Sequence, residues 1–172
     1  MTRNAAIGAS SAIVVALLVA AIWRSQPLAK DVVADRVELS KRTRTLRLYA
    51  GDRVLKEYRV ALGGNPIGHK QREGDERTPE GTYTLDYRNE KSAFHRSIHV
   101  SYPSTTDQKQ ASVAGVDPGG MIMVHGLPNY IGWVGRFHRL VDWTDGCIAV
   151  TNLEIDEVWN AVPNGTLIEI EP

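Results

Sequence analysis

Hydrophobic residues alternate with polar ones along much of the chain after residue 35, which is the pattern of strands with one buried face. The alternation is clearest at residues 37–39, 46–49 and 54–62. The Ala-Gly-Asp sequence at residues 50–52 supplies a turn between the last two of these segments, so we expect a β-hairpin there. The hairpin is predicted to end at the Gly-Gly-Asn-Pro sequence of residues 63–66.

Further short strands follow, separated by polar segments that contain glycine and proline. We expect these strands at residues 82–87, 95–102, 121–124, 147–150 and 166–170. The run at residues 121–124 is apolar throughout, as in a fully buried central strand, and His125 lies at its end. The connecting segments at 67–79, 104–120 and 126–143 are predicted to be irregular, and the charged stretch from Lys70 to Arg77 is expected to be solvated.

One α-helix is clearly indicated near the C-terminus. The spacing Thr151-x-x-Glu154 is a capping box, and apolar residues follow it at helical spacing: Ile155, Val158, Trp159 and Val162. The Pro-Asn-Gly sequence at residues 163–165 ends this helix. The sequence therefore predicts a mainly β domain, a sandwich or barrel, with one clear α-helix packed on the sheet.

The N-terminus has a different composition from the rest of the chain. Residues 5–23 carry no charge, and a helix of this length just reaches across a hydrocarbon core of ~30 Å at ~1.5 Å per residue. We expect residues 1–24 to form an N-terminal transmembrane helix that anchors the protein, with a cleaved signal segment as the alternative. A linker at 25–34 and one globular domain at 35–172 would follow.

The charge balance and the cysteine count narrow the range of functions. The 172 residues include 20 Lys and Arg and 20 Asp and Glu, without a long basic run, so we expect no nucleic-acid partner. Cys147 is the only cysteine, so the chain has no internal disulfide. On the oxidising side of a membrane, such a residue is either buried and inert or a reactive nucleophile.

Cys147 and His125 form the candidate catalytic pair. Each lies at the end of a short apolar strand, and neighbouring strands ~4.8 Å apart could bring the imidazole within reach of the sulfur. Gly146 allows the backbone to approach a substrate closely, and the N–H groups of Gly146 and Cys147 are natural oxyanion donors. Gly126 gives the loop after His125 a similar freedom.

The segment from 126 to 143 holds weaker candidates, each with a purely structural alternative. His138 is either a supporting residue of the site or a hydrogen-bonded surface histidine. Three aromatic residues either wall a substrate groove or simply pack the loop: Tyr130, Trp133 and Trp143. A zinc site is a further alternative, but its four candidate ligands lack paired-ligand spacing, and we expect no metal: His125, His138, Asp142 and Cys147.

Two motifs resemble the signature of the L,D-transpeptidase catalytic domain (YkuD-type) family. Ile122-Met123-Val124-His125-Gly126 and Thr144-Asp145-Gly146-Cys147-Ile148 are similar to the family's His-Gly, loop and Ser/Thr-His-Gly-Cys arrangement. Arg77-Thr78-Pro79-Glu80-Gly81-Thr82-Tyr83 is similar to its Thr-Pro-x-Gly-x-aromatic segment. The resemblance covers roughly residues 35–172 and implies a β-rich sandwich with the cysteine at the floor of a cleft.

The resemblance also implies an activity, a partner and a compartment. Cys147 would attack the amide that joins the third residue of a peptidoglycan stem peptide to the terminal D-alanine, with His125 as the base. An amine or water would then resolve the acyl-enzyme, without a metal or organic cofactor. The domain would lie in the periplasm, anchored in the inner membrane or exported after signal cleavage.

Two departures from the family pattern leave alternatives open. Asp145 replaces the usual histidine, so Thr144 and Asp145 are supporting candidates, and Asp145 is a candidate for orienting an imidazole. Ala149 stands where the family usually has Arg or Asn, which removes a carboxylate contact. The ending after Gly146 resembles a branch that includes a hydrolase releasing lipoprotein from murein, so a murein-linked lipoprotein is a further candidate partner. Transpeptidation, hydrolysis as a carboxypeptidase or amidase, and an inactive envelope binding module all remain possible functions.

Overall fold

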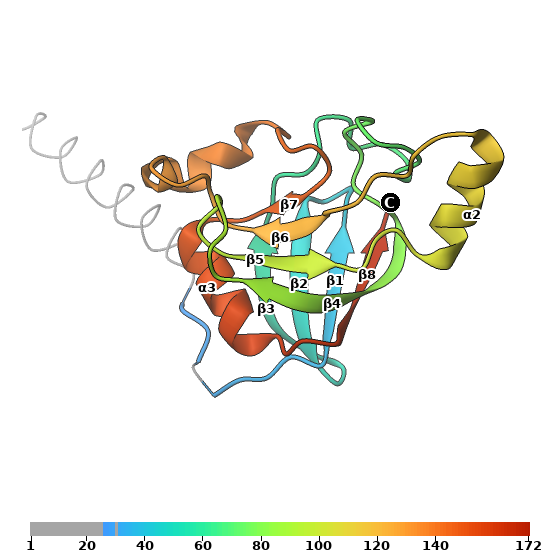
Figure 1. The fold of residues 1–172 in the computed structure, drawn as a ribbon. Helices are drawn as coiled ribbons and strands as arrows, with labels where there is room; N and C mark the ends of the chain where they lie inside the picture. Colours follow the sequence, from blue (N-terminus) through green and yellow to red (C-terminus); the bar gives the residue numbers. More distant parts are fainter. Residues whose placement is uncertain (1–25, 30) are drawn as a thin grey trace, which may run out of the picture.

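The computed structural model describes residues 26–29 and 31–172, which form one strongly curled sheet of eight strands with few helices (Figure 1). The strands follow the order β3-β2-β1-β8-β4-β5-β6-β7. Their bounds are β1 Arg36–Ser40, β2 Thr45–Ala50, β3 Arg53–Arg59, β4 Gly81–Asn89, β5 Ser97–Val100, β6 Met123–His125, β7 Ile148–Ala149 and β8 Thr166–Glu171. The prediction of a mainly β domain is confirmed.

The sheet has two halves that the C-terminal strand joins. Antiparallel ladders connect β1, β2 and β3, which confirms the predicted hairpin. β8 lies parallel to β1 and antiparallel to β4, while β5 and β6 continue the second half in antiparallel fashion and β7 pairs parallel with β6. Beyond β3, Ala61 forms an antiparallel bridge with Ala149 of β7 through hydrogen bonds of 3.0 and 2.8 Å. This bridge draws the two ends of the sheet together.

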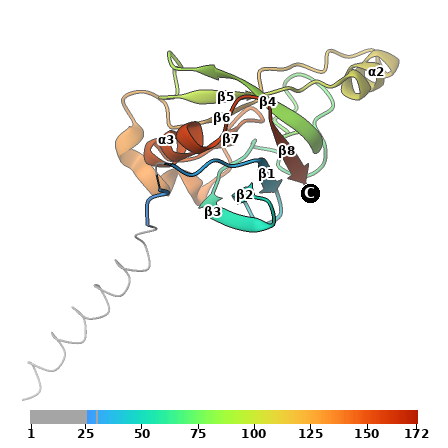
Figure 2. The same ribbon diagram turned by 90° about the horizontal axis from the view of Figure 1, so that it is seen from below.

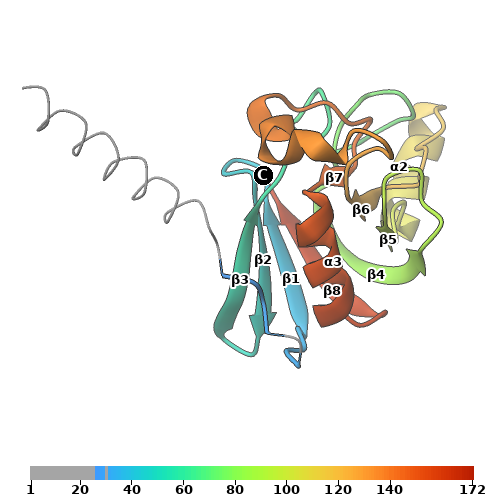
Figure 3. The same cartoon turned by 90° about the vertical axis from the view of Figure 1, so that its left-hand side faces the viewer.

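The core lies inside the curl, and the predicted helix covers it. β8 shows the expected alternation, because Ile168 and Ile170 are buried while Leu167 and Glu169 reach the surface. The helix α3 (Asn152–Ala161) lies between the two halves of the sheet (Figure 3) and contributes buried apolar residues to the same core cluster. Its capping box between Thr151 and Glu154 is present as predicted.

A second helix, α2 (Thr105–Ala114), occupies a segment that was predicted to be irregular, so the expectation of a single helix is wrong. The apolar pattern could not reveal it, because Asp107 and Ala111 are its only buried residues and it lies at the margin of the molecule (Figures 1 and 2). The sequence features that mark α2 are its two caps. Ser104 and Asp107 form a capping box, and Gly115 adopts a left-handed conformation with φ of 67°.

The segment between β6 and β7 was also predicted to be irregular and is partly helical. It contains the 3-10 helical segment η1 (Gly132–Leu140), which is kinked at Gly135, where φ is 53°. η1 lies above the edge of the sheet that carries β7 (Figures 1 and 3).

The predicted membrane anchor at residues 1–24 lies outside the described residues. Within residues 26–29 and 31–172, no helix is long and apolar enough to cross a membrane. The chain joins the folded domain at Ala34, which is buried and donates its N–H to the carbonyl of Ala161 at 2.7 Å.

Candidate active site

The pairing of β6 with β7 places His125 and Cys147 on the same face of the sheet. The parallel register pairs Val124 with Ile148 and His125 with Ala149. Val124 and Ile148 are fully buried in the core. Because side chains alternate along a strand, His125 and Cys147, each one residue from a core position, point to the opposite face.

A cavity of about 580 Å³ opens on that face, and both residues line it. Its walls come from four segments of the chain, within residues 70–74, 89–97, 119–125 and 143–147. The loop between β3 and β4 supplies the first, and the β4–β5 connection supplies the second. The cysteine is partly exposed to this cavity, whereas His125 is only 3% exposed. The predicted pair therefore shares one hollow in the surface.

The imidazole of His125 is held in one tautomer. Its Nδ1 lies 2.6 Å from the carbonyl oxygen of Gly126, which can only accept a hydrogen bond, so Nδ1 carries the proton. Nε2 is then left with a lone pair that can accept a proton. The ring packs against Phe94 and Trp143, at centroid distances of 4.6 and 5.8 Å. Burial lowers the pKa of His125, against the opposing effect of the Gly126 carbonyl, and keeps the imidazole neutral.

The thiol of Cys147 is uncharged in the same resting state. Burial, the largest effect, raises the pKa of Cys147 above its ordinary value, and the carboxylate of Asp145 also raises it. A backbone hydrogen bond from Met123 and the charge of Lys70 act in the opposite direction. The Sγ atom lies 3.7 Å from the carbonyl oxygen of Met121, to which the S–H group donates. A nucleophilic role for this sulfur would require a base, and His125 is the neutral imidazole in the cavity.

The turn before the cysteine is shaped by Gly146. Its φ of 120° is a conformation that L side chains rarely adopt, and a Cβ atom there would lie 2.5 Å from the carbonyl oxygen of Arg77. The Gly146 N–H donates to Thr144 Oγ1 at 3.2 Å, and the Thr144 hydroxyl donates to the Cys147 carbonyl at 2.8 Å. Of the two predicted oxyanion donors, the Gly146 N–H thus already has a partner within the turn. The Cys147 N–H remains the candidate donor.

Gly146→Ala is expected to damage this turn more than an equally strained glycine elsewhere. Gly165 provides the matched control, since its φ is 92° and a Cβ there would meet nothing within 4 Å. Gly165→Ala should cost about 1–2 kcal/mol through backbone strain alone. Gly146→Ala should cost more and slow alkylation of Cys147, because the Arg77 carbonyl must move. Thermal unfolding and the alkylation rate measure both effects, and equal behaviour of the two variants would refute the close contact.

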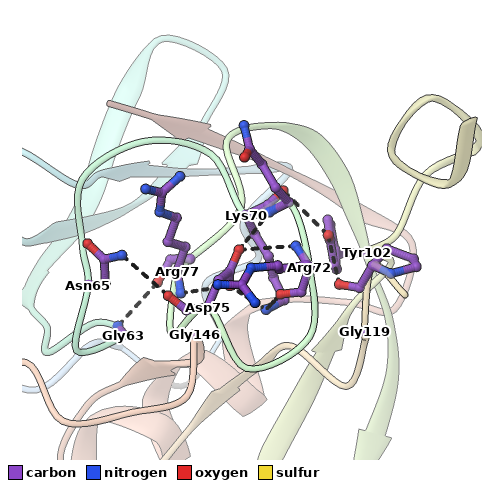
Figure 4. Close-up of polar contacts among 12 residues, drawn as sticks. Gly63, Asn65, Lys70, Arg72, Asp75, Arg77, Tyr102, Gly119 and Gly146 are labelled. Carbon is purple, nitrogen blue, oxygen red and sulfur yellow. Dashed lines mark hydrogen bonds and ion pairs between the residues drawn. The ribbon is translucent and has the colours of Figure 1, made fainter. Parts of the chain in front are cut away.

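The loop from Lys70 to Arg77, predicted to be solvated, is organised around a half-buried ion pair (Figure 4). Lys70 is only 3% exposed, and its Nζ donates to Asp75 Oδ1 at 2.8 Å and to the Arg72 carbonyl at 3.0 Å. The Asp75 carboxylate also accepts the backbone N–H groups of Gln71, Arg72 and Arg77 at 2.7 to 3.1 Å. The expectation of a solvated loop holds only in part, because Arg72, Glu73 and Glu76 are exposed, whereas Lys70 and Asp75 satisfy each other. The loop forms one wall of the cavity.

Asp75→Asn is expected to destabilise the fold by about 2 kcal/mol near neutral pH. Burial alone would raise the pKa of Asp75, but the Lys70 hydrogen bond and the three backbone N–H groups outweigh it and lower the pKa from 3.8 to about 2. A depressed pKa stabilises the folded state above the unfolded value, and this contribution is lost as the pH falls through about 2. Denaturant unfolding of wild type and variant at pH 7 and at successively lower pH measures the difference, which should shrink below pH 4.

Asp35→Asn serves as the control for this measurement. The Asp35 carboxylate accepts one backbone N–H, that of Gly51 at 2.7 Å, and the contact is exposed. Asp35→Asn should therefore lower the free energy of unfolding by less than about 1 kcal/mol. A difference between Asp75→Asn and wild type that stayed constant from pH 7 to pH 2 would contradict the depressed pKa.

The remaining predicted residues lie at different distances from the cavity. Trp143 lines it and donates its Nε1–H to Nδ1 of His138 at 3.4 Å, so His138 supports the wall from behind. Tyr130 and Trp133 are 99% and 84% exposed and do not line the cavity. Asp145 lines it, but the imidazole of His125 is oriented by the Gly126 carbonyl instead. The four residues considered as zinc ligands form no metal-binding cluster, and none occurs elsewhere among the described residues.

Some residues of the site carried no readable signal in the sequence. Phe94 follows a polar turn and packs on the imidazole. Met121 adopts a positive φ of 55°, which is uncommon outside glycine, and thereby aims its carbonyl at the cysteine. Only the Lys70–Asp75 pair had a possible signal, in the close spacing of opposite charges before the Thr-Pro segment.

Known proteins resemble this chain in sequence and in fold. A model of the YkuD family, the L,D-transpeptidase catalytic domain, matches residues 34–170. The Escherichia coli (strain K12) protein named "Putative L,D-transpeptidase YafK" is 29% identical over 142 residues, which are 79% of this chain and 50% of that protein. The chain thus spans about half the length of this relative.

Solved structures show the same fold. The helical cell shape determining protein Pgp2 from Campylobacter jejuni superposes with a TM-score of 0.63 and 27% identity, over 82% of this chain and 48% of that one. Bd1075 from Bdellovibrio bacteriovorus superposes with a TM-score of 0.57 and 21% identity, over 84% of this chain and 50% of that one. The match of the family model over residues 34–170, together with the fold, leads to one conclusion: this chain belongs to the L,D-transpeptidase catalytic domain (YkuD) family.

Proposed function

We propose that this protein is a cysteine acyltransferase that forms an acyl-enzyme on Cys147 with peptidoglycan stem peptides and passes the acyl group to an amine. The observation that carries this proposal is the shared cavity of Cys147 and His125, with the His125 tautomer fixed so that Nε2 can accept a proton. The family acts on such peptides in the cell wall, which supports the substrate class. The E. coli relative carries the name of the same activity.

The proposed chemistry needs only groups that line the cavity. Nε2 of His125 takes the Sγ proton as the sulfur attacks the substrate carbonyl carbon, and the Cys147 N–H faces the developing oxyanion. The carbon–nitrogen bond then breaks, and the imidazolium returns the proton to the leaving amine, which leaves a thioester. In the second half, an amine attacks the thioester, Nε2 takes its proton, and the proton returns to sulfur as the thiol leaves.

Hydrolysis by water in the second half is the alternative outcome of the same site. The departures at Asp145 and Ala149 are the features that favour it, because both change the surroundings of the acyl-enzyme relative to the common family pattern. The inactive binding module is disfavoured by the partial exposure of Cys147 in a cavity that also holds a neutral base.

Product analysis decides between these functions. Purified full-length protein is incubated with disaccharide-tetrapeptide muropeptides, with and without a primary amine acceptor, and the products are identified by mass spectrometry. Cross-linked dimers or amine adducts with released D-alanine are expected. Tripeptides alone would show hydrolysis, and no change in any muropeptide would overturn the proposed function.

We further propose that the protein works in the cell envelope, with residues 5–23 anchoring it in the inner membrane and the catalytic domain in the periplasm. The uncharged sequence of these residues and the cell-wall role of the family support this placement. The cell-shape role named for the Campylobacter jejuni relative supports a part in shaping the wall. A murein-linked lipoprotein is a candidate partner if the acyl-enzyme is resolved on, or formed from, a protein amine.

A further inference from the structure

Asp145 occupies a position in the cavity for which the catalytic steps give it no task. Its carboxylate is exposed, lines the cavity and lies two residues before the nucleophile. Within the described part of the chain, no hydrogen bond or ion pair engages this carboxylate, whereas the nearby carboxylate of Asp75 is paired with Lys70. His125 is oriented by a backbone carbonyl, so Asp145 does not act as the third member of a triad.

The other charges around the cavity do not neutralise Asp145. Lys70 is the only Lys or Arg among the residues that line it, and its ammonium is buried against Asp75 and the Arg72 carbonyl (Figure 4). Glu73 lines the cavity as well and adds a second exposed carboxylate. With His125 neutral, the empty cavity has a net negative charge.

The unpaired carboxylate acts against catalysis while the cavity is empty. It is one of the causes that raise the pKa of Cys147, and it therefore disfavours the thiolate. A cation bound beside Asp145 would cancel this effect, because the field of the ion pair at the sulfur is much weaker than that of the carboxylate alone. Without a cationic ligand, Asp145 therefore disfavours the thiolate of Cys147. With such a ligand bound, this effect is cancelled.

We propose that Asp145 is a specificity-determining residue that binds an ammonium group of the substrate in the catalytic cavity. This inference rests on the proposed function, since it assigns part of the substrate to that same site. The ammonium belongs to a diamino acid or lysine-like side chain, either on the acyl donor or on the acceptor that arrives later. Binding of this group also promotes ionisation of Cys147, so that the nucleophile is activated only when a matching peptide is in place.

The first test needs no natural substrate, because Cys147 is the only cysteine of the chain. Purified full-length protein reacts with two methanethiosulfonates of similar size, one with a trimethylammonium group and one with a sulfonate. The thiolate forms a mixed disulfide and releases methanesulfinate in both cases, and intact mass reports the rates. The ratio of cationic to anionic rates should fall about fivefold in Asp145→Asn, because one unit charge beside the sulfur is lost.

Three variants make this first test specific. Asp145→Glu keeps the charge and should retain most of the ratio. Asp52→Asn removes an exposed carboxylate from the turn between β2 and β3 and should leave the ratio unchanged. Glu73→Gln should lower the ratio less than Asp145→Asn does. An unchanged ratio in Asp145→Asn would overturn the proposal even if peptidoglycan activity were confirmed.

The second test identifies the source of the ammonium. In separate reactions, donor stem peptides carry a free or an acetylated side-chain amine, and acceptor amines carry or lack a second ammonium group, because an acetylated acceptor would have no nucleophilic nitrogen. Asp145→Asn should raise the KM for the partner that carries the ammonium about fivefold. The reaction of the partner that lacks it should be equal to that of wild type or faster, because the carboxylate no longer disfavours the thiolate. An equal loss on free and acetylated peptides would show a structural role only. If the thiol reagents show the expected charge selection but no peptide is turned over, the proposed function is refuted, whereas cation binding by Asp145 stands.

Discussion

Replacement of Cys147 by alanine is expected to abolish the activity, with a loss on the order of 10³-fold or more in product formation. The physical reason is that Cys147 carries the only thiol of the chain and lines the same cavity as the neutral base Nε2 of His125. A β-lactam of the carbapenem type should acylate the wild-type protein, which appears as an increase in intact mass. The Cys147→Ala protein should show neither the adduct nor any muropeptide product.

The fold itself is not expected to depend on the thiol. Cys147 is only partly buried, and its side chain makes one long contact to the Met121 carbonyl at 3.7 Å. Cys147→Ala and Cys147→Ser should therefore unfold within a few degrees of wild type, which separates loss of chemistry from loss of structure. Retention of the adduct in Cys147→Ala would place the nucleophile elsewhere and remove the basis of the proposed mechanism.

His125→Gln has the second largest expected effect, a fall of about 10²- to 10⁴-fold in the acylation rate near neutral pH. The pKa of Cys147 is raised and that of His125 is lowered, so the resting pair is thiol and imidazole and the proton must move during attack. Without the imidazole, only the small fraction of thiolate present at equilibrium can react.

The pH dependence gives this prediction a distinct signature. A lowered pKa means that His125 stays neutral, and the wild-type protein stays active, to a pH below the ordinary histidine value of 6.5. The residual rate of His125→Gln should instead rise with pH until it passes the raised pKa of Cys147. Carbapenem acylation followed by mass spectrometry from pH 5 to pH 10 measures both profiles.

His99→Gln is the matched control for the loss of a histidine from this part of the sheet. His99 lies on β5, where its Nδ1 contacts Asp86 at 2.7 Å and its ring stacks on Tyr87, and it does not line the cavity. Its replacement should leave the acylation rate within about threefold of wild type. Parallel pH profiles for wild type and His125→Gln would contradict the assignment of His125 as the base.

The strands and the C-terminal helix could be predicted from the sequence because their stability depends on regular burial. Residues such as Val37, Leu39, Ile168 and Ile170 repeat with the period of the strand and are all buried. α2 was missed for the opposite reason, because it buries almost no apolar surface and is marked only by the caps Ser104 and Gly115. The prediction of a solvated loop around Asp75 missed only the Lys70–Asp75 pair, because charge in the sequence does not reveal which charges will meet.

The sequence by itself determined which residues can do chemistry here: a single cysteine after glycine, a histidine at the end of an apolar run, and motifs that resemble one family. Only the tertiary structure determined how these residues are placed relative to one another and which tautomer the histidine adopts. The parallel register of β6 and β7 places Cys147 and His125 on one face, and the Gly126 carbonyl fixes the tautomer of the base. The conformation of the loop also holds Lys70 against Asp75, and Asp145 lines the cavity without a partner among the described residues. The pairing of β6 with β7 joins residues far apart in the chain, and the short-range contacts depend on backbone geometry that the pattern of residues does not encode.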